Sequence, residues 1–461
     1  MKKYDALIIG SGQGGTPLAK KLADAGYKTA LIERRWVGGT CVNDGCTPTK
    51  AMIASAKMAH SIQNSDALGV NVERHTIDIR KIIARQQDIV TSFRDGSEKK
   101  LNSTKNLDLI YGEASFTGHK KILVKKNASS EAVTSDLVFL DTGTVSSIPE
   151  IAGLQTIPYL TSTSILQLKE LPQHLLVIGG GYVGMEFAQM YSRFGSRVTM
   201  IVRDARILRK EDEDIASEIH KLFQDENIDI RLNSEAVKIN GGDGIIRVVT
   251  RSNDKDESIS CSHVLIATGR KPDTGILDVS ATDVRTDKRG FITVDNQLQT
   301  NVEGIFALGD VNGGPAFTHI SYHDHLVIFN NLVHHKTETT DGRILPYCMY
   351  MDPQLGRVGI TEQEARSKGV DVQIAKMPMS HVARAIEAGD TRGLMKAVVD
   401  KGNKKILGAA ILGAEGGEIM SVIEVAMMGG LTYDKIRDAI FAHPTYAESL
   451  NNLFAAVGGD Q

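Results

Sequence analysis

The stretch "YDALIIGSGQGGTPLAKKLADAGYKTALIE", residues 4–33, decides the fold of this 461-residue chain. An apolar strand runs into three glycines in G-x-G-x-x-G spacing (Gly10, Gly12 and Gly15), and an amphipathic helix and a second strand follow. Such glycines let the backbone turn tightly and approach a pyrophosphate, whose charge lies at the helix N-terminus. Glu33 ends the second strand, where a carboxylate can bind ribose hydroxyls. The stretch therefore predicts a Rossmann-like unit for a dinucleotide with an unphosphorylated ribose.

The same pattern recurs in "HLLVIGGGYVGMEFAQMYSRFGSRVTMIVR", residues 174–203. Its glycines are Gly179, Gly181 and Gly184, again between an apolar strand and an amphipathic helix. A bare glycine motif can be only a tight turn, but the strand before it and the helix after it favour nucleotide binding. The chain is therefore expected to bind two dinucleotides.

The end of the second strand differs between the two copies. In the second copy Val202 stands where the acid would be, Arg203 follows it, and Arg206 and Arg209 come shortly after. A carboxylate would repel a 2'-phosphate, whereas guanidinium groups can pair with one. We therefore expect NADPH, held by Arg203 and Arg209, with NADH as the alternative cofactor and a solvated basic loop as the structural alternative.

Two of the four cysteines, Cys41 and Cys46, lie in "GGTCVNDGCTPTK", residues 38–50, just before an expected helix. A tetrahedral zinc site would want a second close pair of ligands, and an iron–sulfur cluster would need further cysteines at short spacing. The sequence offers neither pattern, so no metal site is expected. A helix start favours thiolate character, and Gly45 allows the backbone to approach a ring closely. A reversible disulfide beside a flavin fits the pair best, with two inert buried thiols as the alternative.

A second candidate for chemistry lies near the C-terminus, in "FAHPTYAESLNNLF", residues 441–454. His443 and Glu448 flank a turn that Pro444 restricts, and a helix is expected to follow. A carboxylate that pairs with imidazole raises its basicity and fixes its tautomer, which suits proton exchange with a departing thiolate. A purely structural His-Pro turn is the alternative.

Composition excludes several classes of partner. The net charge is -3 with 24% charged residues, and no basic tract suggests a nucleic-acid partner. No apolar stretch approaches the ~20 residues that span a bilayer, and the N-terminal apolar run is expected to be a strand rather than a targeting signal. Cys261 and Cys348 are isolated, which is typical of a cytoplasmic protein. A small-molecule or ion acceptor is the expected partner.

Together these motifs resemble the pyridine nucleotide-disulfide oxidoreductase family, which includes glutathione reductase, dihydrolipoamide dehydrogenase and mercuric reductase. The resemblance runs nearly from end to end and implies bound FAD and NADPH. The residues that it implies in FAD binding are Gly10, Gly12, Gly15, Glu33, Gly39, Thr40, Thr142, Gly143, Gly269, Arg270 and Asp310. Those that it implies in NADPH binding are Gly179, Gly181, Tyr182, Gly184, Arg203 and Arg209.

The resemblance also implies catalytic roles. Cys46 would lie against the flavin as the charge-transfer thiolate, and Cys41 would be the interchange thiol that attacks the substrate. Lys50 and Glu186 resemble the ion pair near the reactive edge of the flavin.

The resemblance implies roles for three further active-site residues. Tyr182 resembles the gate that moves when nicotinamide docks, and His443 and Glu448 match the acid-base pair of the family. That pair acts across a dimer interface in the family, so a homodimer with a shared active site is implied.

The expected fold class is α/β, with two Rossmann-like dinucleotide-binding domains and a C-terminal α+β dimerisation domain. The FAD-binding domain is expected over residues 1–149 and, as a central second segment, over residues 268–339. The NAD(P)-binding domain is expected over residues 150–267. The dimerisation domain is expected over residues 340–461, where long strands and helices carry no glycine fingerprint.

The later segments indicate the subgroup. "FTHISYHDHL", "PYCMYMDPQLGRVGITEQEAR" and "HVARAIEAGDTRGLMKAVVD" look most like mercuric-reductase-like proteins and the bacterial flavoenzymes that resist reactive chlorine and hypothiocyanous acid. The ending "AAVGGDQ" lacks the cysteine pair of mercuric reductase, so true mercuric reduction is not expected. We expect an oxidative-stress enzyme that passes electrons from NADPH through FAD and a Cys41–Cys46 disulfide to a disulfide, metal-ion or oxidant acceptor.

Three alternatives stay open: a dihydrolipoamide dehydrogenase, a redox-sensing flavoprotein that acts through a protein partner, and an oxidase that reduces oxygen directly. The sequence also leaves open whether His319, His323 or His325 lines the flavin or only completes a helix surface.

Overall fold

The computed structural model describes residues 1–126, 129–242 and 244–459, which form two compact units. The first unit comprises residues 1–51, 81–147 and 269–343. The second comprises residues 52–80, 148–268 and 344–461. Because the second unit groups the expected NAD(P)-binding and C-terminal segments together, the four domain boundaries stay predictions.

A seven-stranded sheet forms the centre of the first unit, in the order β3-β2-β1-β6-β5-β4 with β16 paired to β6. The parallel strands are β1 (Lys2–Ile9), β2 (Thr29–Glu33), β3 (Leu107–Tyr111), β6 (Ser130–Leu140) and β16 (Ile305–Ala307). An antiparallel meander of β4 (Glu113–Gly118) and β5 (Lys121–Lys125) extends the sheet. The predicted strand that ends at Glu33 is confirmed.

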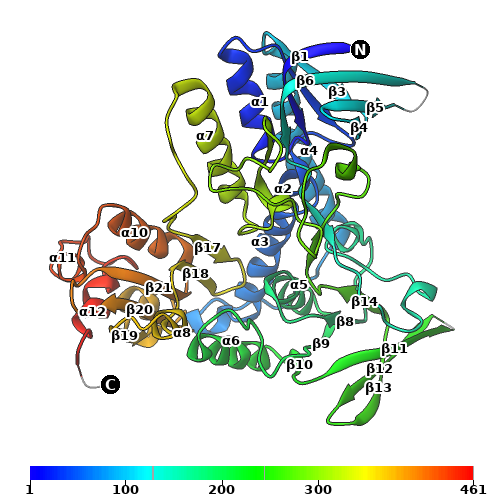
Figure 1. The fold of residues 1–461 in the computed structure, drawn as a ribbon. Coiled ribbons are helices and arrows are strands. Elements are labelled where there is room, and N and C mark those ends of the chain that lie inside the picture. Colours follow the sequence, from blue (N-terminus) through cyan, green and yellow to red (C-terminus); the bar gives the residue numbers. More distant parts are fainter. Residues whose placement is uncertain (127–128, 243, 460–461) are drawn as a thin grey trace. The chain divides into compact units, whose positions relative to one another are not determined.

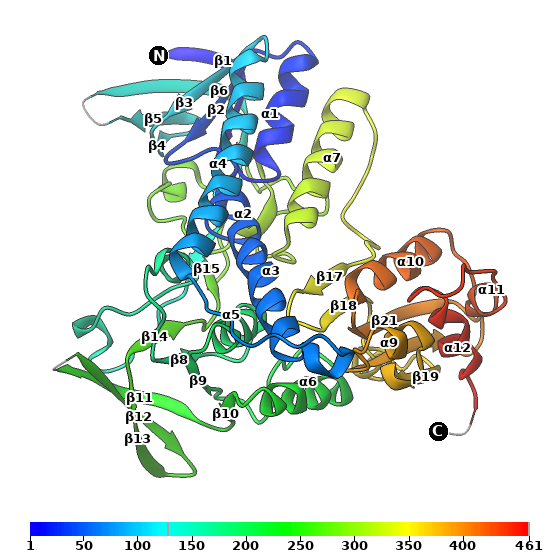
Figure 2. The same ribbon diagram turned by 180° about the vertical axis from the view of Figure 1, so that it is seen from behind.

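Apolar residues on both faces of β1 explain why this strand is central. Ile8 contributes to the core on one face, with Leu18 of α1 (Gly15–Asp24) and Val327 of α7 (Thr318–His334). Leu7 and Ile9 contribute to the core on the other face. Parallel strands are buried on both sides in this way because helices and loops cover both faces. Figures 1 and 2 show α1 and α7 side by side against the sheet.

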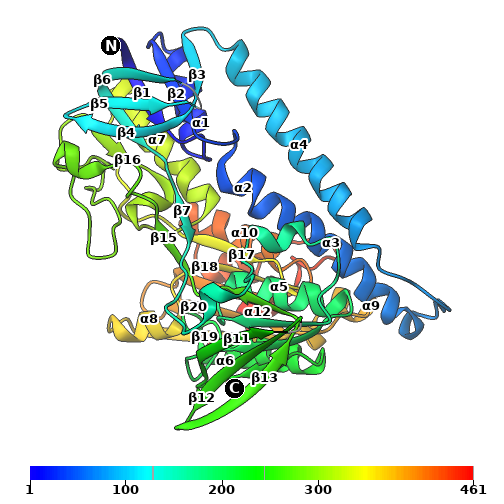
Figure 3. The same ribbon diagram turned by 90° about the vertical axis from the view of Figure 1, so that its right-hand side faces the viewer.

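Two helices connect the units along the chain, and a short helix precedes them. α2 (Gly39–Asn43) lies in the first unit, and α3 (Cys46–Gln63) begins there and ends in the second. The long α4 (Ile79–Ser103), conspicuous in Figure 3, returns the chain to the first unit.

The second unit contains the second nucleotide-binding pattern as a four-stranded parallel sheet in the order β10-β9-β8-β14. Its strands are β8 (His174–Ile178), β9 (Arg197–Ile201), β10 (Asp229–Arg231) and β14 (His263–Ile266), with helices α5 (Tyr182–Arg193) and α6 (Glu213–Asp225). An antiparallel ribbon of β11 (Glu235–Gly242), β12 (Ile245–Ser252) and β13 (Lys255–Cys261) follows β10 (Figure 3). This arrangement confirms a second Rossmann-like part.

The C-terminal part of the second unit is a five-stranded antiparallel sheet in the order β17-β18-β21-β20-β19. Its strands are β17 (Pro346–Met349), β18 (Gln354–Gly359), β19 (Val372–Pro378), β20 (Leu394–Asp400) and β21 (Ile406–Gly413). The helices are α8 (Glu362–Ser367), α9 (Ala383–Glu387), α10 (Gly416–Met428), α11 (Tyr433–Arg437) and α12 (Ser449–Ala455). Ile411, Ile423 and Phe454 share one buried core, so the predicted C-terminal α+β domain is confirmed.

Short elements complete the chain. Strands β7 (Thr144–Ser146) and β15 (Arg270–Pro272) pair with each other. The short 3-10 helices are η1 (Ser65–Leu68), η2 (Leu154–Thr156), η3 (Ser164–Gln167), η4 (Val279–Thr282), η5 (Gly309–Asn312) and η6 (Met379–His381). Among the described residues, no helix is both long enough and apolar enough to cross a membrane.

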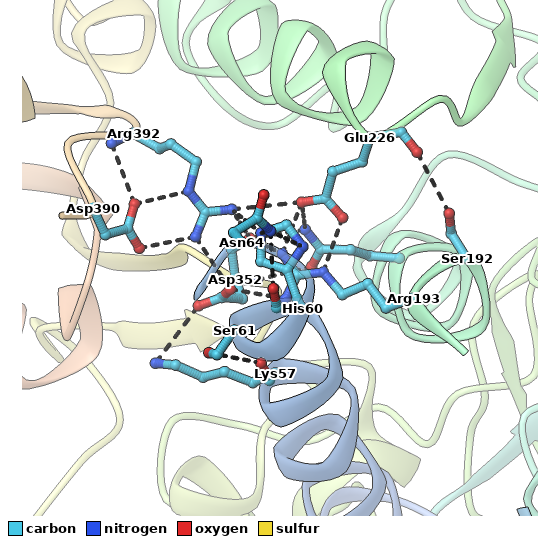
Figure 4. A network of polar contacts seen from close by, with 11 residues as sticks. Lys57, His60, Ser61, Asn64, Ser192, Arg193, Glu226, Asp352, Asp390 and Arg392 are labelled. Carbon is cyan, nitrogen blue, oxygen red and sulfur yellow. Dashed lines mark hydrogen bonds and ion pairs between the residues drawn. The ribbon is translucent and has the colours of Figure 1, made fainter. Parts of the chain in front are cut away.

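A network of charges with Arg193 and Asp352 buried at its centre joins the two parts of the second unit (Figure 4). Arg193, at the end of α5, lies 2.7 Å from a carboxylate oxygen of Glu226 and 2.8 Å from one of Asp352. Arg392 lies 3.2 Å from the same Asp352 oxygen and also binds Asp390 at 2.7 Å. The arginine charges hold the pKa of Asp352 at about 2 despite its burial.

Candidate active site

The first glycine loop lies between β1 and α1 and is shaped by close backbone approaches. Gly10 has a φ of 102°, and a Cβ atom there would lie 2.2 Å from the carbonyl oxygen of Asp141. A Cβ atom at Gly15 would lie 2.3 Å from the carbonyl oxygen of Gly10. Only glycine fits at either position. The loop therefore brings bare backbone to the N-terminus of α1, where a pyrophosphate can be bound.

Glu33 points toward this loop from the end of β2. Its carboxylate accepts hydrogen bonds from the Ser11 backbone N–H at 3.0 Å, from the Ser11 hydroxyl at 2.6 Å and from the Arg35 N–H at 2.8 Å. A carboxylate has about four acceptor positions, so these three bonds orient it and leave capacity for a ribose hydroxyl.

Other residues expected to bind FAD lie in the same unit. A Cβ atom at Gly39 would lie 2.8 Å from Gly12 Cα, so these two predicted positions are in contact. The hydroxyl of Thr142 is buried and has no hydrogen-bond partner among the described residues, and Gly143 follows it with a φ of 66°. An unpaired buried hydroxyl beside the glycine loop fits a site for a polar cofactor group. Thr40, an exposed residue of α2, follows Gly39.

Gly269, Arg270 and Asp310 come from the last segment of the first unit. Gly269 has a φ of 116° and precedes β15. The Arg270 Nε donates to the Thr144 hydroxyl at 2.7 Å, and that hydroxyl lies 3.1 Å from the Asp310 carboxylate. Asp310 lies in η5, shortly after β16 ends at Ala307.

Sequence reasoning missed Asp141, which lies behind the glycine loop. Its carboxylate accepts a hydrogen bond from the Gly15 N–H at 2.7 Å. Burial, and then the charges of Asp310, Asp324 and Glu33, raise the pKa of Asp141 well above its ordinary value. Its position directly after the apolar strand β6, one residue before Thr142, was the available signal.

An Asp141→Asn protein is expected to be more stable than the wild type at neutral pH. A raised pKa in the folded state adds stability that is complete below the unfolded value and is lost as pH rises through the folded value. Asparagine avoids this loss, so its advantage should grow from about pH 4 upward and reach about 1–2 kcal/mol. Urea unfolding of both proteins across this range measures the difference. Asp136→Asn, at an exposed position of the same strand, is the control, and parallel profiles for Asp141→Asn and wild type would refute the assignment.

Cys41 and Cys46 lie close together in the first unit. Cys41 is in α2, and Cys46 is the first residue of α3. The Cys46 Sγ lies 3.5 Å from the hydroxyl of Thr318, the first residue of α7. A hydrogen bond with Cys46, followed by burial, raises the pKa of Cys41, whereas Thr318 and Lys50 lower it.

Cys41 and Cys46 are close enough for the ionisation of one thiol to affect the other. Two thiols that share a hydrogen bond lose their protons in separate steps. The charge of Cys46 also raises the pKa of Cys41, and the thiolate at Cys46 stays a prediction. The helix α3 begins at Cys46, so the helix-start argument applies to Cys46 rather than to Cys41.

Lys50 and Glu186 stand in different units. Lys50 lies one turn after Cys46 on α3 in the first unit. Glu186 is a buried residue of α5 in the second unit, and its carboxylate accepts from the Tyr350 N–H at 2.8 Å. Their pairing stays a prediction.

The second glycine loop repeats the geometry of the first. Gly179 has a φ of 126°, and a Cβ atom there would lie 2.3 Å from the carbonyl oxygen of Ala267. A Cβ atom at Gly184 would lie 2.7 Å from the Gly179 carbonyl oxygen. Around Gly181, no described atom outside its chain neighbours lies within 4 Å of a Cβ position. This space at the start of α5 suits a second pyrophosphate.

The residues after β9 lie beside this loop. Val202 is buried, and its Cγ1 would be 2.8 Å from a Cβ atom at Gly180. Arg203 and Arg209 are exposed, and Arg209 pairs only loosely with Asp204, at 3.6 Å. Two exposed guanidinium groups are therefore available to a ligand. Arg206 instead donates to the Arg209 carbonyl oxygen at 3.1 Å and to Gln363 at 3.3 Å.

Tyr182, the first residue of α5, is held in place by hydrogen bonds. Its hydroxyl lies 2.8 Å from Glu211 Oε1 and 3.0 Å from the Tyr347 hydroxyl. Burial, and then the charge of Glu211, raise the pKa of Tyr182, so its hydroxyl stays protonated. Sequence reasoning named Tyr182 but missed both partners.

His443 and Glu448 form a pair in the second unit. The His443 Nδ1 lies 3.0 Å and 2.9 Å from the two carboxylate oxygens of Glu448, and the imidazole is 67% exposed. With Nδ1 engaged by Glu448, Nε2 is the ring nitrogen that remains for proton exchange.

The three histidines of α7 differ in their surroundings. His319 and His323 are exposed, whereas His325 is fully buried. Burial lowers the pKa of His325 to about 4, so it is a neutral core residue. His319 stacks on Phe317 near Thr318, with 5.4 Å between ring centroids. Within the described residues, no group of three or more His, Cys, Asp or Glu side chains is arranged to hold a metal ion.

Comparisons with known proteins agree with this geometry. The family model "Pyridine nucleotide-disulphide oxidoreductase" matches residues 4–324, and the model of its dimerisation domain matches residues 345–454. The probable pyridine nucleotide-disulfide oxidoreductase RclA of Escherichia coli is 37% identical over 99% of this chain and 100% of its own length. A mercuric reductase of Lysinibacillus sphaericus is 33% identical over 97% of this chain and 81% of its own length.

A solved structure, the Cu(II) complex of the HOCl-induced flavoprotein disulfide reductase RclA from Escherichia coli, superposes with a TM-score of 0.91. The two chains are 36% identical, and the match covers 99% of each.

Proposed function

Since the chain belongs to the pyridine nucleotide-disulfide oxidoreductase family, whose members are flavoenzymes, we propose that it is an NADPH-driven reductase with a Cys41–Cys46 redox disulfide. The family uses FAD and a pyridine nucleotide. The observation that carries the proposal is the close pair of cysteines in the same unit as the first glycine loop. Inert buried thiols do not fit, because Cys46 is exposed.

When bound, FAD supplies two-electron transfer between nicotinamide and the disulfide. The first glycine loop and Glu33 would hold its pyrophosphate and ribose, and Thr142, Arg270 and Asp310 would add polar contacts. Reduction of the disulfide takes two electrons and one proton and gives a thiol at Cys41 and a thiolate at Cys46. Cys46 then holds the first negative charge, supported by the Thr318 hydroxyl at the start of α7. Cys41 is left to attack the acceptor.

His443 is proposed to exchange protons with Cys41 and with the electron-accepting substrate. Glu448 fixes the tautomer through Nδ1, so Nε2 carries the exchanged proton. The chain contains a dimerisation domain, and the exposed imidazole suits a pair that completes the active site of a partner subunit in a homodimer.

NADPH is the proposed electron donor because of the second loop. Val202 fills the strand-end position with an apolar side chain, and Arg203 and Arg209 present exposed guanidinium groups beside it. Guanidinium groups bind phosphate with two parallel hydrogen bonds, and NADH has no 2'-phosphate to accept them.

The proposed acceptor is a disulfide, a metal ion or a chlorine-derived oxidant. The chain resembles a reductase that is induced by HOCl and has been solved as a Cu(II) complex, and it also resembles mercuric reductases. All these acceptors react with a nucleophilic thiol, which is the role proposed for Cys41.

The proposal is tested by initial rates with NADPH and NADH. The acceptors to compare are oxidised glutathione, lipoamide, Cu(II), Hg(II) and hypothiocyanous acid. NADPH is expected to be preferred, and the Arg203→Ala and Arg209→Ala proteins should each raise KM for NADPH about 10- to 100-fold and leave KM for NADH unchanged.

Arg206→Ala is the matched control, because this arginine already binds Arg209 and Gln363. A clear NADH preference of the wild type would overturn the role given to the arginines. No turnover with any of these acceptors would overturn the proposed reductase.

A further inference from the structure

The hydroxyl of Tyr182 is part of a three-residue cluster in which Glu211 is buried and the two tyrosines are half-buried. Glu211 Oε1 accepts hydrogen bonds from the hydroxyls of Tyr182, at 2.8 Å, and Tyr347, and these two hydroxyls lie 3.0 Å apart. The two rings are tilted against each other, with 5.4 Å between centroids. The cluster joins α5 of the parallel-sheet part to β17 of the antiparallel sheet.

The charge of Glu211 has a partner in the antiparallel sheet. Its side chain is 0% exposed, and its Oε2 lies 3.7 Å from the Nε of Arg357, which is 1% exposed. Arg357 lies on β18, directly opposite Tyr347 in the register of β17 and β18. Because a nearby cation stabilises a buried carboxylate, Arg357 holds Glu211 in place.

The residues after Glu211 are held by the same sheet. Lys396, 2% exposed, lies 3.1 Å from Asp212 and 3.0 Å from Asp214. Lys376 lies 2.8 Å from Asp214.

The cations that bind this acidic segment, residues 211–214, form a row across the strands. Paired positions run Lys376 to Lys396, Lys396 to Ala410, Ala410 to Arg357 and Arg357 to Tyr347. The segment therefore lies along one cationic row, which fixes Glu211 against Tyr182.

We propose that Glu211 and Tyr347 form a latch on Tyr182, and that the strength of this latch sets the affinity of the enzyme for nicotinamide dinucleotides. The inference rests on the proposed function and on the resemblance of Tyr182 to the gate of the family, which moves when nicotinamide docks. Arg357 and Lys396 are positioning residues, since they act through Glu211 and its neighbours.

The physical argument is a population shift. If the nucleotide binds only when Tyr182 has left the cluster, its apparent affinity is reduced by the fraction of molecules in that state. Hydrogen bonds to a charged acceptor favour the latched state, so weakening them should tighten binding. Nicotinamide is common to both coenzymes, so the effect should be equal for NADP+ and NAD+.

The test uses Tyr182→Phe, which keeps the ring and removes the hydroxyl. Glu211 retains the bond from Tyr347, so the buried carboxylate is not orphaned. The full-length holoenzyme of this variant is expected to bind NADP+ and NAD+ each about tenfold more tightly in titration calorimetry, which corresponds to about 1.4 kcal/mol. Glu211→Gln keeps an acceptor without the charge and should give about threefold tighter binding.

Two controls separate a latch from a general loosening. Tyr191→Phe removes a buried hydroxyl from the same helix, where it donates to the Ile165 carbonyl oxygen at 2.8 Å, and should leave both affinities unchanged. The Tyr182→Phe/Glu211→Gln double variant should bind no more tightly than Tyr182→Phe alone, because both changes act on one bond.

Unchanged or weaker binding by Tyr182→Phe, or an equal gain in Tyr191→Phe, would overturn the latch. Failure of the proposed function gives a different result, since the wild type itself would then bind neither nucleotide.

Discussion

A Cys41→Ser protein is expected to keep its flavin and to lose turnover with the natural acceptor by about 10³-fold or more. A serine hydroxyl cannot close a disulfide, and it does not replace a thiol as the nucleophile. The residues proposed to hold FAD do not include the Cys41 side chain, so cofactor content should match that of the wild type. The measurement is acceptor-dependent NADPH oxidation, together with the flavin-to-protein ratio from the visible spectrum.

The matched control is Cys261→Ala. Cys261 is a buried thiol of β13 in the second unit, where it behaves as a small apolar residue. This variant should retain full turnover. Full turnover in Cys41→Ser would show that electrons reach the acceptor without the cysteine pair, as in an oxidase that reduces oxygen directly.

An Asp352→Asn protein is expected to lose about 2–3 kcal/mol of stability at pH 7. In the network of Figure 4, Asp352 accepts from Arg193 at 2.8 Å and lies 3.2 Å from Arg392. These two cations, and Lys57 at 3.5 Å, account for a pKa held at about 2 despite burial. The amide would leave Arg193, which is 3% exposed, with one anionic partner fewer.

The pH dependence of this effect has a definite sign. A carboxyl whose folded pKa is depressed gives stability that is present above its unfolded value, near 3.8, and is lost as pH falls through about 2. The difference between wild type and Asp352→Asn should therefore be largest above pH 4 and shrink toward pH 2. Urea midpoints at several pH values measure it. Asp438→Asn changes an exposed residue that pairs with its neighbour Arg437 and should match the wild type. A pH-independent gap for Asp352→Asn would contradict the role of its charge.

The parts of the fold that local sequence patterns control could be predicted. The strand that ends at Glu33 and the helices that follow both glycine loops depend on neighbours in the chain, since apolar periodicity and glycine spacing act over a few residues. The pairing of His443 with Glu448 was also within reach, because only five positions and one turn separate them.

Contacts between distant segments could not be predicted in the same way. Tyr347 and Arg357 meet Glu211 only because β17 and β18 pack against the segment before α6. Asp141 reaches the glycine loop from a strand more than a hundred residues away in the chain, as its bond to Gly15 shows. Nothing in the local pattern around these residues encodes such partners.

The pKa shifts of buried side chains could not be predicted from the sequence either. The position of Cys41 near a helix start suggested an acidic thiol, but the neighbouring Cys46 and burial shift its pKa upward. The sequence did not distinguish the three histidines His319, His323 and His325. In the structure, α7 turns His325 into the core and leaves His319 and His323 exposed.

The central claim, that electrons pass from NADPH through flavin to the Cys41–Cys46 pair, is tested most directly by anaerobic titration with NADPH. The wild type should develop long-wavelength absorbance from a thiolate beside the oxidised flavin, and Cys41→Ser should show it before any NADPH is added. Cys46→Ser should never show it, because the proposed thiolate beside the flavin is that of Cys46. Bleaching of the wild-type flavin by NADPH with no long-wavelength band at any stage would contradict the account.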